Sequence, residues 1–307
     1  MGWPYLLTPL IPIAVLLELL HSPATVVFAA SALGIIPTAA LMGRATEELA
    51  ARSGPGIGGL GRDKQRFSRT SASIQTTMLM LAAAALIMPA IFELVEGKGL
   101  PQPGAEAIHY GGTVEHLSLA VAVVLMITYV IGLFFSLKTH RDLFNPEYEE
   151  EDTWGWSTRT SVIALAIAGV LVGVMSEVLV GSITEASESV GLSEFFIGVI
   201  VVAIVGNAAE HWVAVLVAMK DKMDLAVNIA VGSSAQIALF VAPVLVIASF
   251  FIGPYPLALV FNGFELGAIL LAILVGNHVT TDGESTWFEG VQLLAVYFVF
   301  GLAFYFA

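Results

Sequence analysis

Long apolar stretches alternate with short polar loops along the chain, and this alternation constrains the fold more than any other feature. A helix that crosses a bilayer needs about 20 mostly apolar residues. Judged by that length, the sequence predicts nine spanning helices, of which the first is short and rich in proline. They are expected at residues 4–20, 24–42, 74–95, 117–137, 159–181, 195–218, 225–251, 257–277 and 288–306. The sequence therefore predicts an all-α polytopic membrane protein.

The composition excludes the main soluble classes of protein. Hydrophobic residues fill 57% of the 307 positions and charged residues only 12%, whereas a soluble domain carries about 25% charged residues. The formal net charge of −13 would repel a phosphate backbone, so we expect no nucleic acid as a partner. Because the chain has no cysteine, disulfides, thiolate zinc sites and iron–sulfur clusters are excluded. The expected partner is the lipid bilayer.

Basic residues predict the orientation of the helices, because Lys and Arg gather in cytoplasmic loops. With a cytoplasmic N-terminus, 11 of the 12 basic residues lie on the cytoplasmic side, mainly in the loops at 43–73 and 138–158, and only Lys98 lies outside. Almost no chain precedes the first span. We therefore expect an integral protein of a prokaryotic inner membrane.

The sixth stretch carries polar residues where the bilayer makes them costly. In IVGNAAEHWVAV, Asn207, Glu210 and His211 share one helix face, since they are three and four residues apart. Ionisable residues inside a membrane usually mark an ion or proton path, and carboxylate and amide oxygens are the ligands that Ca²⁺ prefers. We predict a cation site at Asn207 and Glu210. The alternative is that these polar side chains only hold helices together.

Polar residues in three other stretches are further candidates. Ser233 and Gln236, in VGSSAQ, lie three residues apart and their neutral oxygens could complete a shell around a cation. Small residues at a tight helix crossing would explain the serine equally well. Glu177, in VMSEVLVGS, is a carboxylate inside the fifth stretch, and Glu265 is one inside the eighth. Of these four, Glu265 is the weakest candidate, because no other polar cluster accompanies it in sequence.

Patterns typical of membrane-embedded enzymes are absent from the sequence. The zinc pattern H-x-x-E-H would need a histidine where this chain has Asn207, and neither H-E-x-x-H nor G-x-S-x-G occurs. We therefore expect no enzymatic activity and no bound cofactor.

A short segment after the second stretch is similar in sequence to a segment of the fifth stretch. Residues 46–49 read TEEL and residues 176–179 read SEVL, which pairs Glu47 with Glu177. In the predicted topology the two stretches run in opposite directions across the membrane. Inverted repeats of this kind are common in secondary transporters, with the substrate site at their interface. Glu47 is therefore added to the candidate metal ligands.

Four segments together resemble a known family. They are IIPTAALMGRATEELAARSGP at 35–55, MSEVLVGS at 175–182, GNAAEH at 206–211 and GSSAQIALFVAP at 232–243. These segments look like those of the calcium/proton antiporters, the CAX family of the cation/calcium exchanger superfamily. The resemblance implies an inverted-repeat architecture of eleven helices, one leading helix followed by two repeats of five. It also implies that Ca²⁺, or a similar divalent cation, is exchanged for protons.

The resemblance gives each candidate residue a role. It implies that Glu210 and Asn207 are the cation ligands of the second repeat and that Glu177 lines the path. Proton coupling would fall to Glu210, Glu177 and the flanking His211. The resemblance places two further candidate metal ligands on the facing helix: Ser233 and Gln236.

The first half of the sequence departs from the family pattern. Members carry a first motif resembling GNATEL, whereas here GPGIGGL at 54–60 runs directly into GRDKQRFSRT at 61–70. Two helices, roughly 50 residues, are missing there by deletion or omission. A Cα–Cα distance of about 3.8 Å across 60–61 would indicate a true bond. We expect an incomplete first repeat at 1–144, an acidic cytoplasmic linker at 145–153 and a complete second repeat at 154–307.

Three functions stay open at this point. Exchange by the family's mechanism uses a carboxylate from each repeat, since two carboxylates neutralise a divalent cation and two protons return the empty site in neutral form. The absence of the first motif leaves Glu210 without that partner. A non-transporting membrane protein of the same lineage is therefore the alternative, and a Na⁺- or K⁺-coupled cation exchanger is the third reading.

Overall fold

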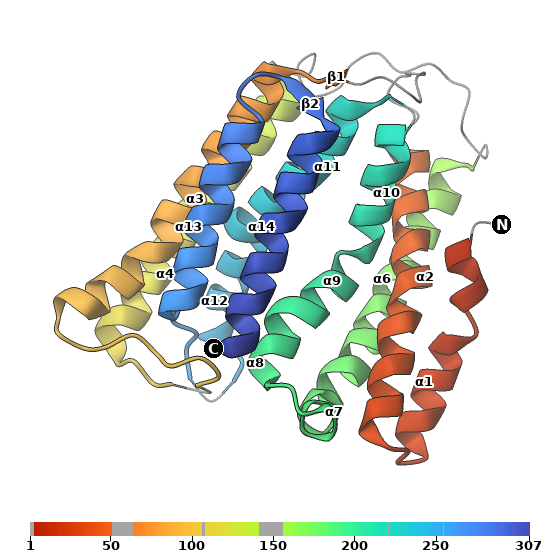
Figure 1. Ribbon diagram of the computed structural model, residues 1–307, viewed down its shortest axis with the longest axis horizontal. Coiled ribbons are helices and arrows are strands. Elements are labelled where there is room, and N and C mark those ends of the chain that lie inside the picture. The colour runs from red at the N-terminus through yellow and green to blue at the C-terminus, as the bar shows by residue number, and fades with distance from the viewer. Residues whose placement is uncertain (1–2, 51–63, 106–107, 141–155, 220, 254) are drawn as a thin grey trace. The chain divides into compact units, whose positions relative to one another are not determined.

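The computed structural model describes residues 3–50, 64–105, 108–140, 156–219, 221–253 and 255–307. Within these ranges the chain is mostly helical, and its long helices are linked by short loops (Figure 1). The junction at 60–61 and the acidic linker at 145–153 lie outside the described residues.

The helices and strands follow one another without a large sheet. The first half contains a 3₁₀ helix η1 (Trp3–Leu7), α1 (Leu10–Leu19), α2 (Ala24–Ala50), β1 (Lys64–Arg66), α3 (Arg69–Val95), α4 (Gly112–Phe134) and the π-helix η3 (Phe135–Thr139). The second half contains α6 (Thr158–Gly181), α7 (Ile183–Val190), α8 (Glu194–Phe196), the π-helix η4 (Ile197–Val202), α9 (Ala203–Gly206), α10 (Ala208–Met219), α11 (Met223–Gln236), the π-helix η5 (Ile237–Val241), α12 (Ala242–Ser249), α13 (Gly263–Val279), β2 (Glu284–Thr286) and α14 (Trp287–Phe306).

Six helices of the described residues are long and apolar enough to cross a membrane. They are α2, α3, α4, α6, α14 and the continuous segment Met223–Ser249. The remaining predicted spans correspond to shorter apolar helices, at Pro4–Leu19, Glu210–Met219 and Gly263–Val279. The predicted span at 257–277 begins later because Asn262 caps α13, where its Oδ1 accepts hydrogen bonds from Phe264 N at 2.9 Å and Glu265 N at 3.0 Å.

The sixth predicted span is wrong as a single helix at 195–218. A bend of 115° between α7 and the segment Glu194–Gly206 precedes the predicted span, and within the span Asn207 separates α9 from α10. The break has a local cause. Gly206 weakens the helix, and Asn207 Nδ2 donates to the Ala203 carbonyl at 2.9 Å, a side-chain contact that competes with regular helix.

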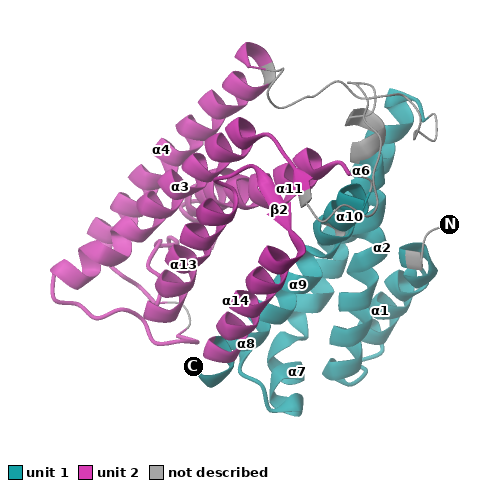
Figure 2. Cartoon of the chain, turned by 45° about the horizontal axis from the view of Figure 1, so that its top comes forward, with its two compact units in different colours: residues 1–58, 146–220, 304–306 teal, residues 59–145, 221–303, 307 magenta. Residues whose placement is uncertain are grey.

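The chain divides into two compact units (Figure 2). Unit 1 contains residues 1–58, 146–220 and 304–306, and unit 2 contains residues 59–145, 221–303 and 307. Each unit thus combines segments from both halves of the sequence.

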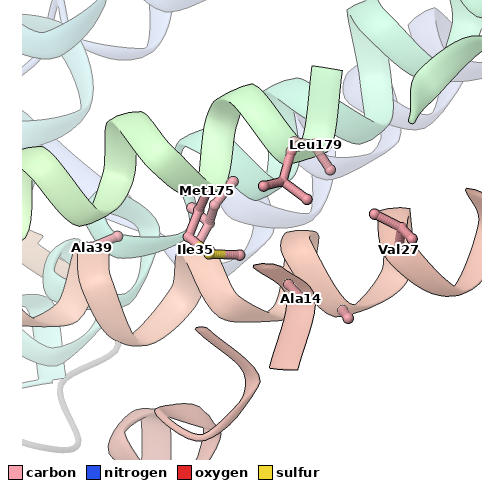
Figure 3. Packing of buried hydrophobic residues seen from close by; sticks show 8 residues of the cluster. Ala14, Val27, Ile35, Ala39, Met175 and Leu179 are labelled. Atoms are coloured by element: carbon pink, nitrogen blue, oxygen red, sulfur yellow. The ribbon is translucent and has the colours of Figure 1, made fainter. Parts of the chain in front are cut away.

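In unit 1 the core forms where α2 packs along α6, with α1 against them (Figure 3). Ile35 and Ala39 of α2 lie against Met175 of α6, which is fully buried. Gly34 lies at this close approach, since a Cβ there would lie 2.7 Å from the Met175 Cε and would displace the end of that side chain. Small residues at such crossings are the usual means by which helices pack in a membrane.

In unit 2 the core forms between α3, α4 and the segment from α11 to α12. Ala82 of α3, Leu125 of α4 and Leu239 of η5 are fully buried in one cluster. The loop before α13 joins this core, because Leu259 N donates to the buried Ser118 Oγ of α4 at 2.9 Å.

Loop contacts within each unit agree with the predicted alternation of sides. In unit 1, Thr25 and Ser189 hydrogen bond at 2.6 Å. Thr25 follows the loop at 21–23, and Ser189 lies in the loop predicted at 182–194; both loops are expected on the outer side. In unit 2, β1 pairs antiparallel with β2, with Gln65 opposite Ser285, and both strands lie in loops expected on the cytoplasmic side.

Candidate ion-binding site

The GNAAEH segment of unit 1 forms the break in a helix. The π-helix η4 precedes it, Asn207 sits at the break, and Glu210 lies in the first turn of α10. Directly after the break, His211 N donates to the Asn207 carbonyl at 2.9 Å, a regular hydrogen bond of the first turn of α10. Asn207, Glu210 and His211 are all exposed.

This geometry has clear chemical consequences. The N-terminus of a helix carries a partial positive charge, which attracts a carboxylate in the first turn, where Glu210 lies. Broken helices also present backbone oxygens to a cation. An anionic carboxylate beside an amide oxygen and an interrupted backbone is the kind of site that takes a hard cation.

The other acidic candidates of unit 1 are Glu177 and Glu47, and neither lies at the helix break. Glu177 lies in the last turn of α6 and is exposed, while Met175, Val178 and Leu179 of the same helix are buried. The side chain of Glu47 in α2 lies outside what the structure describes. Among the described residues, no group of three or more acidic or histidine side chains could hold a metal ion.

The two candidates of unit 2 lie at the end of α11. Ser233 Oγ donates to the Ala230 carbonyl at 3.4 Å, a bond within its own helix. Gln236 is exposed and is the last residue of α11 before the π-helix η5. Short π segments occur frequently at functional sites, and here one follows the GSSAQ segment directly.

Glu265, predicted as a weaker candidate, has a structural role. Its Oε2 accepts a hydrogen bond from Asn262 N at 2.8 Å, which completes a capping box at the start of α13. A second capping box joins Thr286 and Glu289 at the start of α14. The N-x-x-E and T-x-x-E spacings before apolar runs were the sequence signal for both.

Two side-chain contacts in unit 2 were not predicted. Glu93 is only 2% exposed, and its Oε1 lies 3.4 Å from Lys98 Nζ. The Nδ1 of His109 lies 2.7 Å from Oε1 of the buried Glu115. These pairs connect the loop between α3 and α4 to both helices, and sequence alone gives no sign of them.

A polar seam between α3 and α11 was also missed. Ser71 Oγ donates to Asn228 Oδ1 at 3.2 Å, and Gln75 Nε2 donates to the same oxygen at 2.8 Å. The signal was the run RTSASIQTT at residues 69–77. The predicted span begins at residue 74, so it leaves Ser71 in the preceding loop and includes Gln75 without a partner.

Comparison with known proteins places the chain in a family. The family model described as sodium/calcium exchanger protein matches residues 160–306. The Ca²⁺/H⁺ antiporter of Aphanothece halophytica is 37% identical, with 96% of this chain and 94% of the relative covered. The Ca²⁺/H⁺ antiporter ChaA of Bacillus subtilis is 36% identical, with 96% of both chains covered.

Solved structures agree with these relatives. The structure of native YfkE matches with a TM-score of 0.78 at 32% identity, over 99% of this chain and 100% of that chain. The H⁺/Ca²⁺ exchanger CAX matches with a TM-score of 0.51 at 14% identity, which is a likeness of fold alone.

The alignments are longer than the chain itself. They run over 367 positions for the Aphanothece antiporter and 339 for the Bacillus antiporter, whereas this chain has 307 residues. Each relative therefore carries residues that stand opposite gaps in this chain. With identity above 30% over nearly the whole length, the chain belongs to the Ca²⁺/H⁺ antiporters of the sodium/calcium exchanger family.

Proposed function

We propose that the protein is a secondary active transporter that exchanges Ca²⁺, or a similar divalent cation, for protons across a membrane. The observation that carries the proposal is the broken helix at GNAAEH, with Glu210 in the first turn of α10 and Asn207 at the break. The relatives named Ca²⁺/H⁺ antiporters support it. Ca²⁺ and H⁺ are then the transported substrates.

Glu210 serves both substrates in this proposal. Calcium binding needs the ionised carboxylate, so binding of Ca²⁺ and binding of a proton exclude each other. Asn207 contributes a neutral oxygen whose ligand strength does not change with pH. Glu177 and His211 take part in proton coupling, and the sequence-based assignment of metal ligands extends to Ser233, Gln236 and Glu47.

The architecture in this proposal is the inverted-repeat exchanger fold with nine transmembrane helices. The first repeat lacks two helices at residues 60–61, and the second repeat is complete. Relatives that carry residues opposite gaps in this chain support the loss. The basic loops support a cytoplasmic N-terminus in a prokaryotic inner membrane.

One alternative has a specific observation in its favour. The segment that would resemble GNATEL does not occur in the sequence, so a second embedded carboxylate from that motif is not available. A non-transporting membrane protein of the same lineage would show the same fold and would bind or move no calcium.

Transport by inverted membrane vesicles distinguishes the two. Vesicles that contain the protein and an acidic interior should take up ⁴⁵Ca²⁺, and an uncoupler should abolish the uptake. Glu210→Gln keeps the size of the side chain but removes its charge, so the initial rate should fall at least about tenfold, which corresponds to 1.4 kcal/mol. Glu18→Gln in α1, an exposed carboxylate at a helix end, is the matched control and should transport normally. Equal uptake by all three proteins and by empty vesicles would support the non-transporting alternative.

A further inference from the structure

The polar seam between α3 and α11 follows one face of each helix in unit 2. At its start Ser68 N donates to Asp224 Oδ1. Further along, Ser71 Oγ and Gln75 Nε2 both donate to Asn228 Oδ1, at 3.2 and 2.8 Å. The partners advance together along both helices, so α3 and α11 run parallel. Beyond the seam the contact becomes apolar, with Ala82 and Leu239 in one buried cluster.

Gln75 is the last side chain of α3 in this seam, and its amide is held in one orientation. Because Nε2 donates to Asn228, Oε1 points away from that residue. Oε1 is buried and accepts no hydrogen bond from the described residues. Buried polar atoms of native proteins are nearly always satisfied, so an unpaired carbonyl in the interior indicates an ordered water or an ion as its partner.

Gly232 of α11 lies beside this oxygen. A Cβ at position 232 would lie 3.5 Å from Gln75 Oε1, which is van der Waals contact. Asp224, Asn228 and Gly232 are four residues apart and lie on one face of α11. The seam therefore leads from a carboxylate at the start of α11 to a free amide oxygen beside the VGSSAQ segment.

We propose that Gln75 is a further oxygen ligand for the partly hydrated divalent cation on its path along α11. This inference rests on the proposed function. An amide oxygen is a hard, neutral donor of the kind that fills Ca²⁺ shells of 6–8 oxygens. A neutral ligand also suits a transport path, because each site along the path must bind the cation weakly enough to release it. Asp224 attracts the cation to the start of the seam, and Gln75 replaces part of its water shell.

Three variants separate ligation from helix packing. Gln75→Met keeps the length of the side chain and removes the oxygen. Gly232→Ala leaves every polar atom of the seam in place and adds a methyl group 3.5 Å from the oxygen, on the side that faces α11. Ser71→Ala removes one hydrogen bond of the same network but leaves the Gln75 oxygen free, and it is the matched control.

The readout is the rise in melting temperature of the purified full-length protein with Ca²⁺, titrated to give an apparent dissociation constant. Gln75→Met and Gly232→Ala should each weaken Ca²⁺ binding about threefold to tenfold, and Ser71→Ala should bind as the wild type does. Wild-type binding by Gln75→Met would overturn the proposal, and so would equal weakening by Ser71→Ala. If Gln75→Met does not fold, Gln75→Glu keeps an oxygen and adds a charge, so it should bind Ca²⁺ more tightly; unchanged or weaker binding would overturn the proposal.

The Glu210→Gln variant separates this inference from the proposed function. If Ca²⁺ stabilises the wild type but not Glu210→Gln, while Gln75→Met behaves as the wild type, only the role of Gln75 is overturned. If Ca²⁺ stabilises neither the wild type nor any variant, the proposed function fails and the role of Gln75 fails with it.

Discussion

Several glutamates in or beside the apolar helices have a structural role. Glu265 and Glu289 complete capping boxes, and Glu93 and Glu115 pair with Lys98 and His109. Glu210, in contrast, is exposed in the first turn of a helix that follows a break. This difference supports the proposal that Glu210 takes part in the exchange.

The phenol of Tyr110 should make stability depend on pH in the alkaline range. Burial raises the pKa of Tyr110 above its ordinary value of 10.0, and the negative charges of Glu93 and Glu265 raise the pKa further. The neutral phenol therefore contributes stability that is fully present below the unfolded pKa, about 10, and is lost as the pH rises through the folded pKa.

Melting temperatures measured from about pH 8 to pH 11 test this dependence. The wild type should lose stability above about pH 10 relative to Tyr110→Phe, whose side chain does not titrate. Parallel curves for the two proteins would contradict the assigned environment of Tyr110.

Among the elements, helices with simple apolar patterns were predicted closely and interrupted ones were not. The span predicted at 159–181 is α6 at Thr158–Gly181, because Ser157 caps its start and accepts from Thr160 N at 3.0 Å. The break at Asn207 was missed because average hydropathy does not register a side chain that donates to the carbonyl four residues earlier. The β1–β2 pair was missed because its strands are short, polar and far apart in sequence.

The β1–β2 contact depends on one glycine. Gly283 has φ +74°, and a Cβ there would lie 3.1 Å from both the Phe67 carbonyl oxygen and the Arg69 Cβ. Gly283→Ala should therefore destabilise unit 2 by about 1–2 kcal/mol, from backbone strain and crowding together. Gly290→Ala, in α14 where nothing lies within 4 Å of the added Cβ, is the control.

Thermal unfolding of both variants measures the effect. The account expects a lower melting temperature for Gly283→Ala and an unchanged or higher one for Gly290→Ala, since alanine favours helix. Equal melting temperatures would mean that the strand pair contributes little to stability.

For the whole molecule, the sequence was sufficient for the class of protein and for its family. Apolar stretches of spanning length predicted the helical membrane fold, and the GNAAEH and GSSAQ segments predicted the antiporter relatives that were found. The sequence did not predict how the helices divide into compact units, because each unit is built from both halves of the chain. Such pairing depends on contacts between distant residues, such as Gln75 with Asn228.

The proposed loss of two helices from the first repeat leads to a prediction about the whole chain. Insertion between residues 60 and 61 of the Bacillus subtilis antiporter segment that aligns there should supply the second carboxylate of the proposed exchange site. The initial rate of ⁴⁵Ca²⁺ uptake should rise above that of the present chain. Insertion of a two-helix apolar segment without a carboxylate is the control, and an equal effect of both insertions would contradict the prediction.

The central claim is that the protein exchanges Ca²⁺ for protons, and the most direct test is to measure both movements in the same preparation. Proteoliposomes with an acidic interior and a pH-sensitive dye should report proton release when Ca²⁺ is added outside, in proportion to ⁴⁵Ca²⁺ taken up in parallel. The account predicts that the wild type couples the two movements and that Glu210→Gln shows neither. Calcium uptake without proton release, or coupled exchange that persists in Glu210→Gln, would contradict it.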